Sequence, residues 1–180
     1  MFDVNAKELR EALIDDIKAG LVPMVASSPG MGKSDIIRDI AKQFHLKVFD
    51  MRMSQCEPVD MQGYPGTKDD RMTFFVPEYF PLETDKIPEG YDGWLLFLDE
   101  FNSGHKQTEA AAYKLILDRA VYTYKLHPRC MIICAGNLST DRAIVNTAST
   151  ATTSRLIHYR MRVDHNIWIV WANMNDIDHR

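Results

Sequence analysis

The sequence predicts an α/β fold with a mostly parallel sheet covered by helices on both faces. Short apolar runs alternate along the chain with stretches whose apolar residues recur at helical spacing, and this alternation is typical of such sheets. The chain has 180 residues, about the length of one domain. Its 46% of hydrophobic and 26% of charged residues fit a globular domain with a buried core.

The first elements are marked by their caps and by apolar spacing. Asn5 is expected to cap a helix that carries Leu9, Leu13 and Ile17 on one face. Gly20 is expected to stop this helix. A short strand, a glycine-containing turn, a helix with an apolar stripe and a second strand follow. The strand, helix and second strand span residues 21–27, 34–45 and 46–54.

The connection over residues 55–93 is rich in proline and glycine. Such a long connection inside a compact domain is usually functional or mobile. After it, a buried strand over 94–98 ends in two acids, and a helix runs from about Lys106 to Ala120. The remaining predicted elements are a strand, a weakly patterned helix, an alternating strand and a helix start, at residues 130–137, 141–155, 156–163 and 166–174.

Charge and cysteine usage argue against several classes of protein. The net charge of −4 gives no general attraction to nucleic acid or to anionic lipid. The three cysteines form no CxxC pair, and an odd number is a poor disulfide framework, so a reducing, cytoplasmic setting is predicted. The N-terminus lacks the apolar core of a signal peptide, and the longest apolar runs are too short to cross a bilayer.

The turn after the first predicted strand matches the phosphate-binding pattern GxxxxGK(S/T), except that Ser27 replaces the first glycine. Glycines let backbone N–H groups face phosphate oxygens, and the following helix adds its dipole. Lys33 is expected to reach the β- and γ-phosphates, and the Ser34 hydroxyl to ligate magnesium. The alternative is a chance glycine turn with a capping serine. The predicted nucleotide-binding residues are Ser28, Pro29, Gly30, Met31, Gly32, Lys33 and Ser34.

Polar residues also follow two later strands. Asp99 is expected to hold magnesium, and Glu100 to orient and deprotonate the attacking water. The alternative is a pair of solvated acids at a helix start. Asn137 ends the strand over 130–137 and is a candidate to bind the γ-phosphate or the water; the alternative is an asparagine favoured by a turn. Because ligands of such sheets bind beyond the carboxyl ends of the strands, these residues should converge.

A basic residue is needed to offset charge in the transition state of phosphoryl transfer. Arg155 precedes the last predicted strand and is the first candidate, reaching a neighbouring subunit's γ-phosphate. Arg142 is a second candidate for the same role. The alternative is that both are surface arginines. The six histidines show no metal-ligand spacing.

With SSPGMGKSD, LLFLDE, ICAGN and TSRL in this order, the chain resembles an AAA+ ATPase. It is most similar to the MoxR-type branch, including versions encoded by bacteriophages, because MRMSQCEPVDMQGYPG, AGNLSTDRAIVNTAS and VDHNIWIVWA follow the second, fourth and fifth strands. The resemblance implies a three-layer P-loop NTPase core with a five-stranded sheet in the order 5-1-4-3-2. It also implies a ring, commonly a hexamer, with ATP and Mg²⁺ bound between subunits in a bacterial or phage-infected cytoplasm.

By position, the resemblance assigns Lys33 and Ser34 to Walker A, and Asp99 and Glu100 to Walker B. Asn137 and Arg155 then match sensor 1 and the trans-acting arginine finger; the resemblance to the family implies these roles. MoxR-type proteins are similar to chaperone-like remodellers of partner proteins, often ones with von Willebrand factor A domains.

The resemblance divides the chain into a nucleotide-binding domain over residues 1–165 and the start of a helical lid over 166–180, which the sequence truncates or lacks. Two further functions therefore stay open. One is a nucleotide-gated binding or scaffold protein with little turnover, suggested by the short lid and by Ser27. The other is a DNA-acting accessory such as a helicase loader, for which Arg160 and Arg162 are the compact basic feature.

Overall fold

The computed structural model describes residues 1–138, 156–166, 169 and 173. Within them, a six-stranded sheet forms the centre of the molecule, and each of its strands runs parallel to its neighbours. In order across the sheet, the strands are β1 (Phe2–Val4), β10 (Ile157–Met161), β2 (Pro23–Ser27), β9 (Cys130–Asn137), β6 (Gly93–Asp99) and β3 (Leu46–Arg52).

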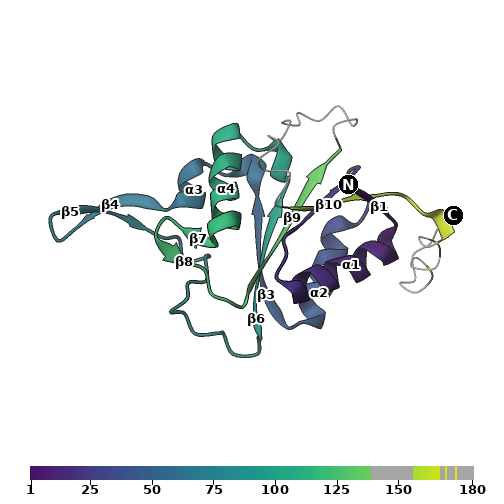
Figure 1. Cartoon of the computed structure of the whole chain (residues 1–180), viewed down its shortest axis with the longest axis horizontal. Coiled ribbons are helices and arrows are strands. Elements are labelled where there is room, and N and C mark those ends of the chain that lie inside the picture. Colours follow the sequence, from purple (N-terminus) through teal and green to yellow (C-terminus); the bar gives the residue numbers. More distant parts are fainter. Residues whose placement is uncertain (139–155, 167–168, 170–172, 174–180) are drawn as a thin grey trace.

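Helices cover both faces of this sheet (Figure 1), and the predicted α/β fold with a parallel sheet is confirmed. One face is covered by α1 (Ala6–Ala19) and α2 (Lys33–Gln43), and the other by α3 (Pro58–Gln62) and α4 (Lys106–Asp118). The alternation along β6 shows the division, because Phe97 packs in the core under α1 and α2 whereas Leu96 and Leu98 pack in the core under α4.

The first helix forms as its sequence predicts. Asn5 Oδ1 accepts the Glu8 N–H at 2.9 Å, and Glu8 Oε2 accepts the Asn5 N–H at 2.8 Å. This reciprocal pair satisfies two donors that a helix start would otherwise leave unpaired. At the other end, Gly20 takes a left-handed conformation with φ of 70° and caps the helix.

The sheet differs from the prediction at one edge. Five strands follow the expected order 5-1-4-3-2, but β1 adds a sixth beside β10, with Phe2 in register with Tyr159. Asp3 fastens this strand, because its carboxylate accepts two hydrogen bonds from Arg160, both 2.6 Å long. Three residues are too few to show a strand period, which is why sequence pattern missed β1.

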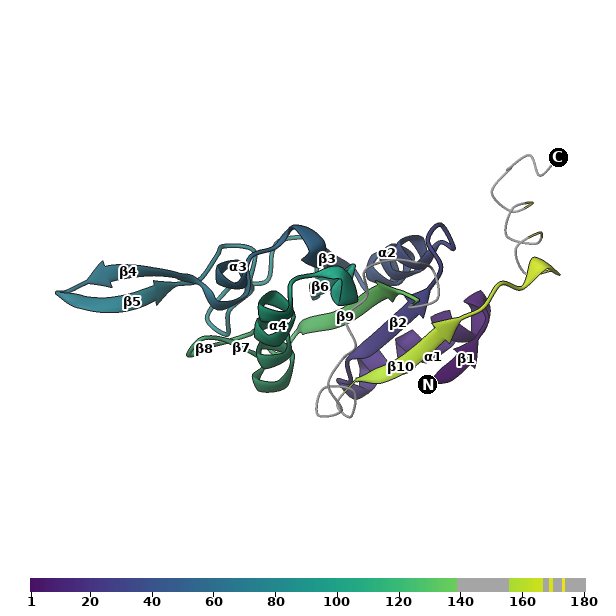
Figure 2. The same cartoon turned by 90° about the horizontal axis from the view of Figure 1, so that it is seen from above.

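The 55–93 connection has more structure than the prediction gave it. It includes α3 and an antiparallel hairpin, β4 (Tyr64–Lys68) and β5 (Arg71–Phe75), which extends away from the sheet in both views (Figures 1 and 2). Asp69 and Asp70 turn the hairpin with φ of 52° and 57°, the left-handed pair that a tight two-residue turn requires. Proline and glycine inside β4 disguise it in the sequence.

Short elements complete the described structure. They are the 3₁₀ turns η1 (Met53–Gln55) and η2 (Phe101–Ser103), and a small hairpin of β7 (Ala120–Val121) and β8 (Tyr124–Lys125). The helix predicted to reach Ala120 ends two residues earlier, because Arg119 is left-handed with φ of 48°.

Several expectations fall on residues whose structure is not described. The predicted helix over 141–155, with Arg142 and Arg155, lies wholly outside the described residues. The helix start predicted at 166–174 lies mostly outside them. No helix among the described residues is long and apolar enough to span a membrane.

Candidate functional site

The predicted polar clusters lie at the carboxyl ends of three adjacent strands. In the sheet order β2-β9-β6, these strands end at Ser27, Asn137 and Asp99. Ser27 and Asn137 are register partners. Parallel strands bring such ends to the same edge of a sheet, where ligands of open α/β folds bind. The convergence expected from the sequence is therefore present.

The turn between β2 and α2 has the backbone shape of a phosphate loop. Gly30 and Gly32 take left-handed conformations, with φ of 77° and 80°, which side-chain-bearing residues adopt at a cost. A Cβ at either glycine would meet nothing within 4 Å, so the loop is open at both positions. Gly32 is also the N-cap of α2, and no side chain caps this helix start. Helix starts of this kind are sites where anions bind, because the first backbone N–H groups and the helix dipole face them.

Lys33 lies beneath this loop and is nearly buried, with 8% of its surface exposed. Its ammonium donates to Ser27 Oγ at 2.8 Å, to Ser27 O at 3.3 Å and to Ser28 O at 3.5 Å. The Ser27 hydroxyl in turn donates to Ser28 O at 2.9 Å, which leaves its lone pairs for Lys33. The serine that departs from the loop pattern therefore contributes a direct acceptor for the lysine.

Ser34 and Asp99 are 65 positions apart in the sequence but meet at this edge of the sheet. The Ser34 hydroxyl donates to Asp99 Oδ2 over 3.4 Å. Asp99 Oδ1 accepts the Glu100 backbone N–H at 2.8 Å, which orients the carboxylate. A hydroxyl and a carboxylate on adjacent supports are oxygen ligands of the kind that Mg²⁺ binds, alongside water and phosphate oxygens.

Glu100 leaves the sheet in a left-handed conformation, with φ of 53°. Its side chain reaches towards β3, where Ser54 in η1 donates a hydrogen bond from its hydroxyl to Glu100 Oε2. Sequence reasoning missed Ser54. The signal in the sequence was the position of Ser54 at the end of the second predicted strand. In the structure, β3 pairs with the acid-bearing strand β6, and Arg52 is in register with Asp99.

Asn137 is held by a residue that the sequence analysis also missed. The Asn102 side chain donates to Asn137 O at 2.7 Å and accepts from Asn137 N at 3.1 Å. These two bonds fix the backbone at the end of β9, so the Asn137 side chain leaves the strand from a defined point. Asn102 stands two residues after Glu100, in a segment that the sequence analysis did not interpret.

A larger metal centre is absent from the described part of the chain, where no cluster of three or more histidine, cysteine or acidic residues forms. A cation at this edge would therefore rely on Ser34, Asp99, water and ligand oxygens. Magnesium is commonly bound in this way, because it keeps several waters and takes only one or two carboxylates together with substrate phosphates. The donor set thus fits the predicted ion.

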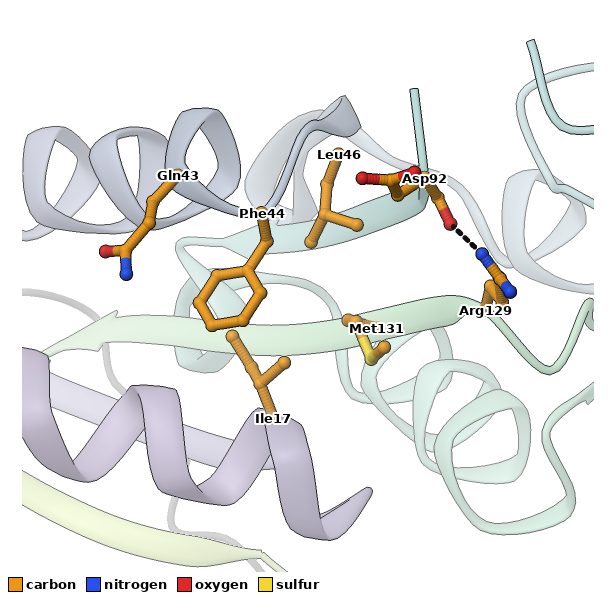
Figure 3. A pocket seen from close by; sticks show the side chains of 7 residues that line it. All are labelled: Ile17, Gln43, Phe44, Leu46, Asp92, Arg129 and Met131. Carbon is orange, nitrogen blue, oxygen red and sulfur yellow. Dashed lines mark hydrogen bonds between the residues drawn. The ribbon is translucent and has the colours of Figure 1, made fainter. Parts of the chain in front are cut away.

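Two cavities of about 380 Å³ lie away from the loop. In the first, Leu46, Asp92 and Met131 are at the amino ends of β3, β6 and β9, so this cavity opens at the opposite edge of the sheet. Figure 3 shows its apolar floor and Arg129, which donates to Asp92 O at 3.2 Å on its rim. The second lies beside β3 and is lined in part by Cys56 and Tyr79, and burial raises the pKa of both side chains.

Comparison with known proteins identifies the fold. No protein-family model matches the sequence, and no curated protein does. Among solved structures, the chain is similar to the crystal structure of a putative ATPase from Cytophaga hutchinsonii ATCC 33406, with a TM-score of 0.69 and 14% sequence identity. The match covers 96% of this chain, which spans 51% of the length of that protein. At this identity the match shows a shared α/β fold with a parallel sheet.

Proposed function

We propose that the chain binds ATP with Mg²⁺ at the carboxyl edge of its sheet and hydrolyses it. The contact between Ser34 Oγ and Asp99 Oδ2 is the observation that carries the proposal. It joins the loop that would hold phosphates to the acid that would hold the metal. A chance glycine turn would not place Lys33, Ser34 and a strand-end carboxylate at one point.

Each residue has a distinct role in this proposal. The backbone of residues 28–32 and the Lys33 ammonium bind the phosphate oxygens, and Ser34 and Asp99 hold the magnesium ion. The ion supplies positive charge that offsets the charge developing on the phosphates. Glu100 orients and deprotonates water, and Asn137 positions it against the γ-phosphate. Phosphoryl transfer needs mainly this positioning and charge stabilisation.

Nucleotide binding is tested first by replacing the lysine. In Lys33→Ala, affinity for a fluorescent ATP analogue should fall by at least about tenfold, since a charged hydrogen bond contributes roughly 1.5–3 kcal/mol. Lys42→Ala is the matched control, because Lys42 lies on the same helix but 81% of its side chain is exposed. Equal affinity in Lys33→Ala and the parent would contradict the phosphate-loop assignment.

Hydrolysis is tested separately with Glu100→Gln, which should retain ATP binding and lose turnover. Glu89→Gln, an exposed glutamate ahead of β6, is the control.

The second candidate function, a nucleotide-gated binding protein with little turnover, is favoured by one observation. Lys33 and Glu100, the side chains proposed to bind phosphate and to activate water, are each hydrogen-bonded to a serine of the chain itself. Equal single-turnover rates in Glu100→Gln and the parent would favour that function over the enzyme.

Assembly and biological role are proposed from the family resemblance. We infer a homo-oligomeric ring that remodels a partner protein, for which a von Willebrand factor A domain is the first candidate. Arg155, or alternatively Arg142, would complete the neighbouring subunit's site. Light scattering with and without ATP tests the ring. If a ring forms, mixing Arg155→Ala subunits with parent subunits should suppress hydrolysis while ATP binding persists; a fall with Arg142→Ala instead would reassign the finger.

The structure gives little support to a DNA-acting role. Both arginines of the compact basic feature face acids, since Arg160 is paired with Asp3 at 2.6 Å and Arg162 lies 4.0 Å from Glu8. Phosphate contacts would have to displace these partners. Salt-dependent DNA binding would revive the role, because counterion release is its signature.

A further inference from the structure

Asn102 connects two parts of the candidate site, the segment that follows Glu100 and the end of β9 at Asn137. It lies in η2 (Phe101–Ser103), two residues after Glu100, and its side chain bonds to the backbone of Asn137. One amide group serves both as donor, at 2.7 Å to the carbonyl oxygen, and as acceptor, at 3.1 Å from the N–H. The side chain thereby takes the place of a neighbouring strand, because β6 and β9 stop pairing at Leu98 and Cys134.

The backbone of β9 is shaped to receive this side chain. A Cβ added at Gly136 would lie 2.4 Å from Asn102 Oδ1 and 2.8 Å from Asn102 Cγ. Real Cβ contacts are essentially never this short, so a larger residue at this position would displace the Asn102 amide, and also the Met24 Cε methyl group, which would lie 2.8 Å away. Gly136 is itself buried whereas Asn102 is partly exposed, so the Asn102 amide is a group that can move. Close approach of a side chain to backbone is a reason for glycine within a strand.

We propose that Asn102 is a positioning residue for ATP hydrolysis, which holds Asn137 and Glu100 at a fixed separation. The proposal rests on the function proposed above. The link runs from Glu100 through the η2 turn, where the Ser103 N–H donates to Glu100 O at 2.9 Å, to Asn102 and then to Asn137. Glu100 and Asn137 must act on the same water, so their separation matters. A displacement of 1 Å in such a site can lower a rate about 100-fold.

Two variants break the link in different ways. Asn102→Ala removes both hydrogen bonds, whereas Gly136→Ala keeps the asparagine but forces its amide out of position. In both, kcat should fall about 10- to 100-fold while the dissociation constant for a non-hydrolysable ATP analogue changes less than about twofold. Binding should persist because neither residue belongs to the phosphate loop. Ser103→Ala is the control, since Ser103 acts on Glu100 through its backbone.

A purely structural role for Asn102 would give a different result. It would weaken nucleotide binding and turnover together. Both variants should lose some thermal stability, because a lost hydrogen bond or a forced contact costs about 1–3 kcal/mol. Their affinity for the ATP analogue should nevertheless stay that of the Ser103→Ala control. A direct readout is the hydrogen exchange of the Asn137 amide, which should become faster in Asn102→Ala because its acceptor is gone.

The outcomes separate this proposal from the proposed function. A parent protein that hydrolyses ATP, with Asn102→Ala and Gly136→Ala keeping its kcat, would overturn the positioning role alone. So would a loss of rate confined to Asn102→Ala. A parent that binds no ATP or hydrolyses none would contradict the proposed function, and the catalytic role of Asn102 with it.

Discussion

The Asp16 carboxylate offers a test of the physical reasoning that is independent of function. Asp16 lies near the end of α1 and is 8% exposed. Its Oδ2 has no hydrogen-bond partner among the described residues. Burial raises the pKa of Asp16, the Tyr159 hydroxyl opposes that change, and the nearby Asp15 charge adds to it. Replacing it with asparagine keeps the shape and removes the charge.

We expect Asp16→Asn to raise the free energy of unfolding by about 1 kcal/mol at neutral pH. A buried polar atom without a partner costs about 1–3 kcal/mol, and an anion close to a helix C-terminus costs about 0.3–1 kcal/mol more. The new amide will still lack one partner, so only part of this cost is recovered. For a domain of this size, the change corresponds to about 2–4 °C in the thermal midpoint.

The effect should depend on pH in a defined direction. Because the folded-state pKa of Asp16 is raised above the unfolded value of 3.8, the folded protein binds this proton more tightly. The contribution of Asp16 is therefore most favourable below the unfolded pKa and is lost as pH rises through the folded pKa. The asparagine variant has no such group, so its advantage should be small in acid and larger at neutral pH.

Urea unfolding at about pH 4.5 and about pH 7.5 measures this difference directly. Asp15→Asn is the matched control, because Asp15 is its exposed neighbour on the same helix. The reasoning would be refuted by a variant less stable than the parent at neutral pH. It would equally be refuted if the difference between variant and parent were the same at the two pH values.

Two further predictions concern side chains whose surroundings the structure defines. Ser54→Ala should leave nucleotide affinity unchanged and raise kcat by up to about tenfold in steady-state kinetics. Glu100 would then no longer have to give up a hydrogen bond of about 0.5–1.5 kcal/mol to reach water. An unchanged kcat would show that this bond is not broken in turnover. Burial raises the pKa of all three thiols, that of Cys130 to about 11. A thiol reagent at neutral pH should therefore label half-buried Cys56 slowly and spare Cys130 and Cys134 until urea unfolds the chain, and fast labelling of Cys134 would contradict its burial.

Much of the sheet was predictable because its signals are local. The apolar run that becomes β6 and the helical stripe that becomes α2 are contiguous in the sequence. The hairpin of β4 and β5 was not, because Pro65 and Gly66 read as turn residues. Their strand is stabilised by pairing with a partner segment, and pairing is not a property of either segment alone.

For the candidate site, sequence pattern supplied the chemistry of the residues but not their partners. Spacing pointed to Lys33 and Asp99, which begin helix α2 and end strand β6. The roles of these residues stay predictions until nucleotide binding is measured. Ser54 and Asn102 escaped notice because hydroxyl and amide side chains are common in turns, and only folding brings each of them against a residue 35 or more positions away.

The sequence by itself determined the α/β class, the cap and stop of the first helix, and the loop of residues 28–34, because each depends on neighbouring residues and their backbone preferences. Only the tertiary structure decided that β1 extends the sheet beside β10. It alone decided that Asn102 fastens the end of β9. In each of these two contacts the partners are far apart in the sequence, and strand order and register bring them together.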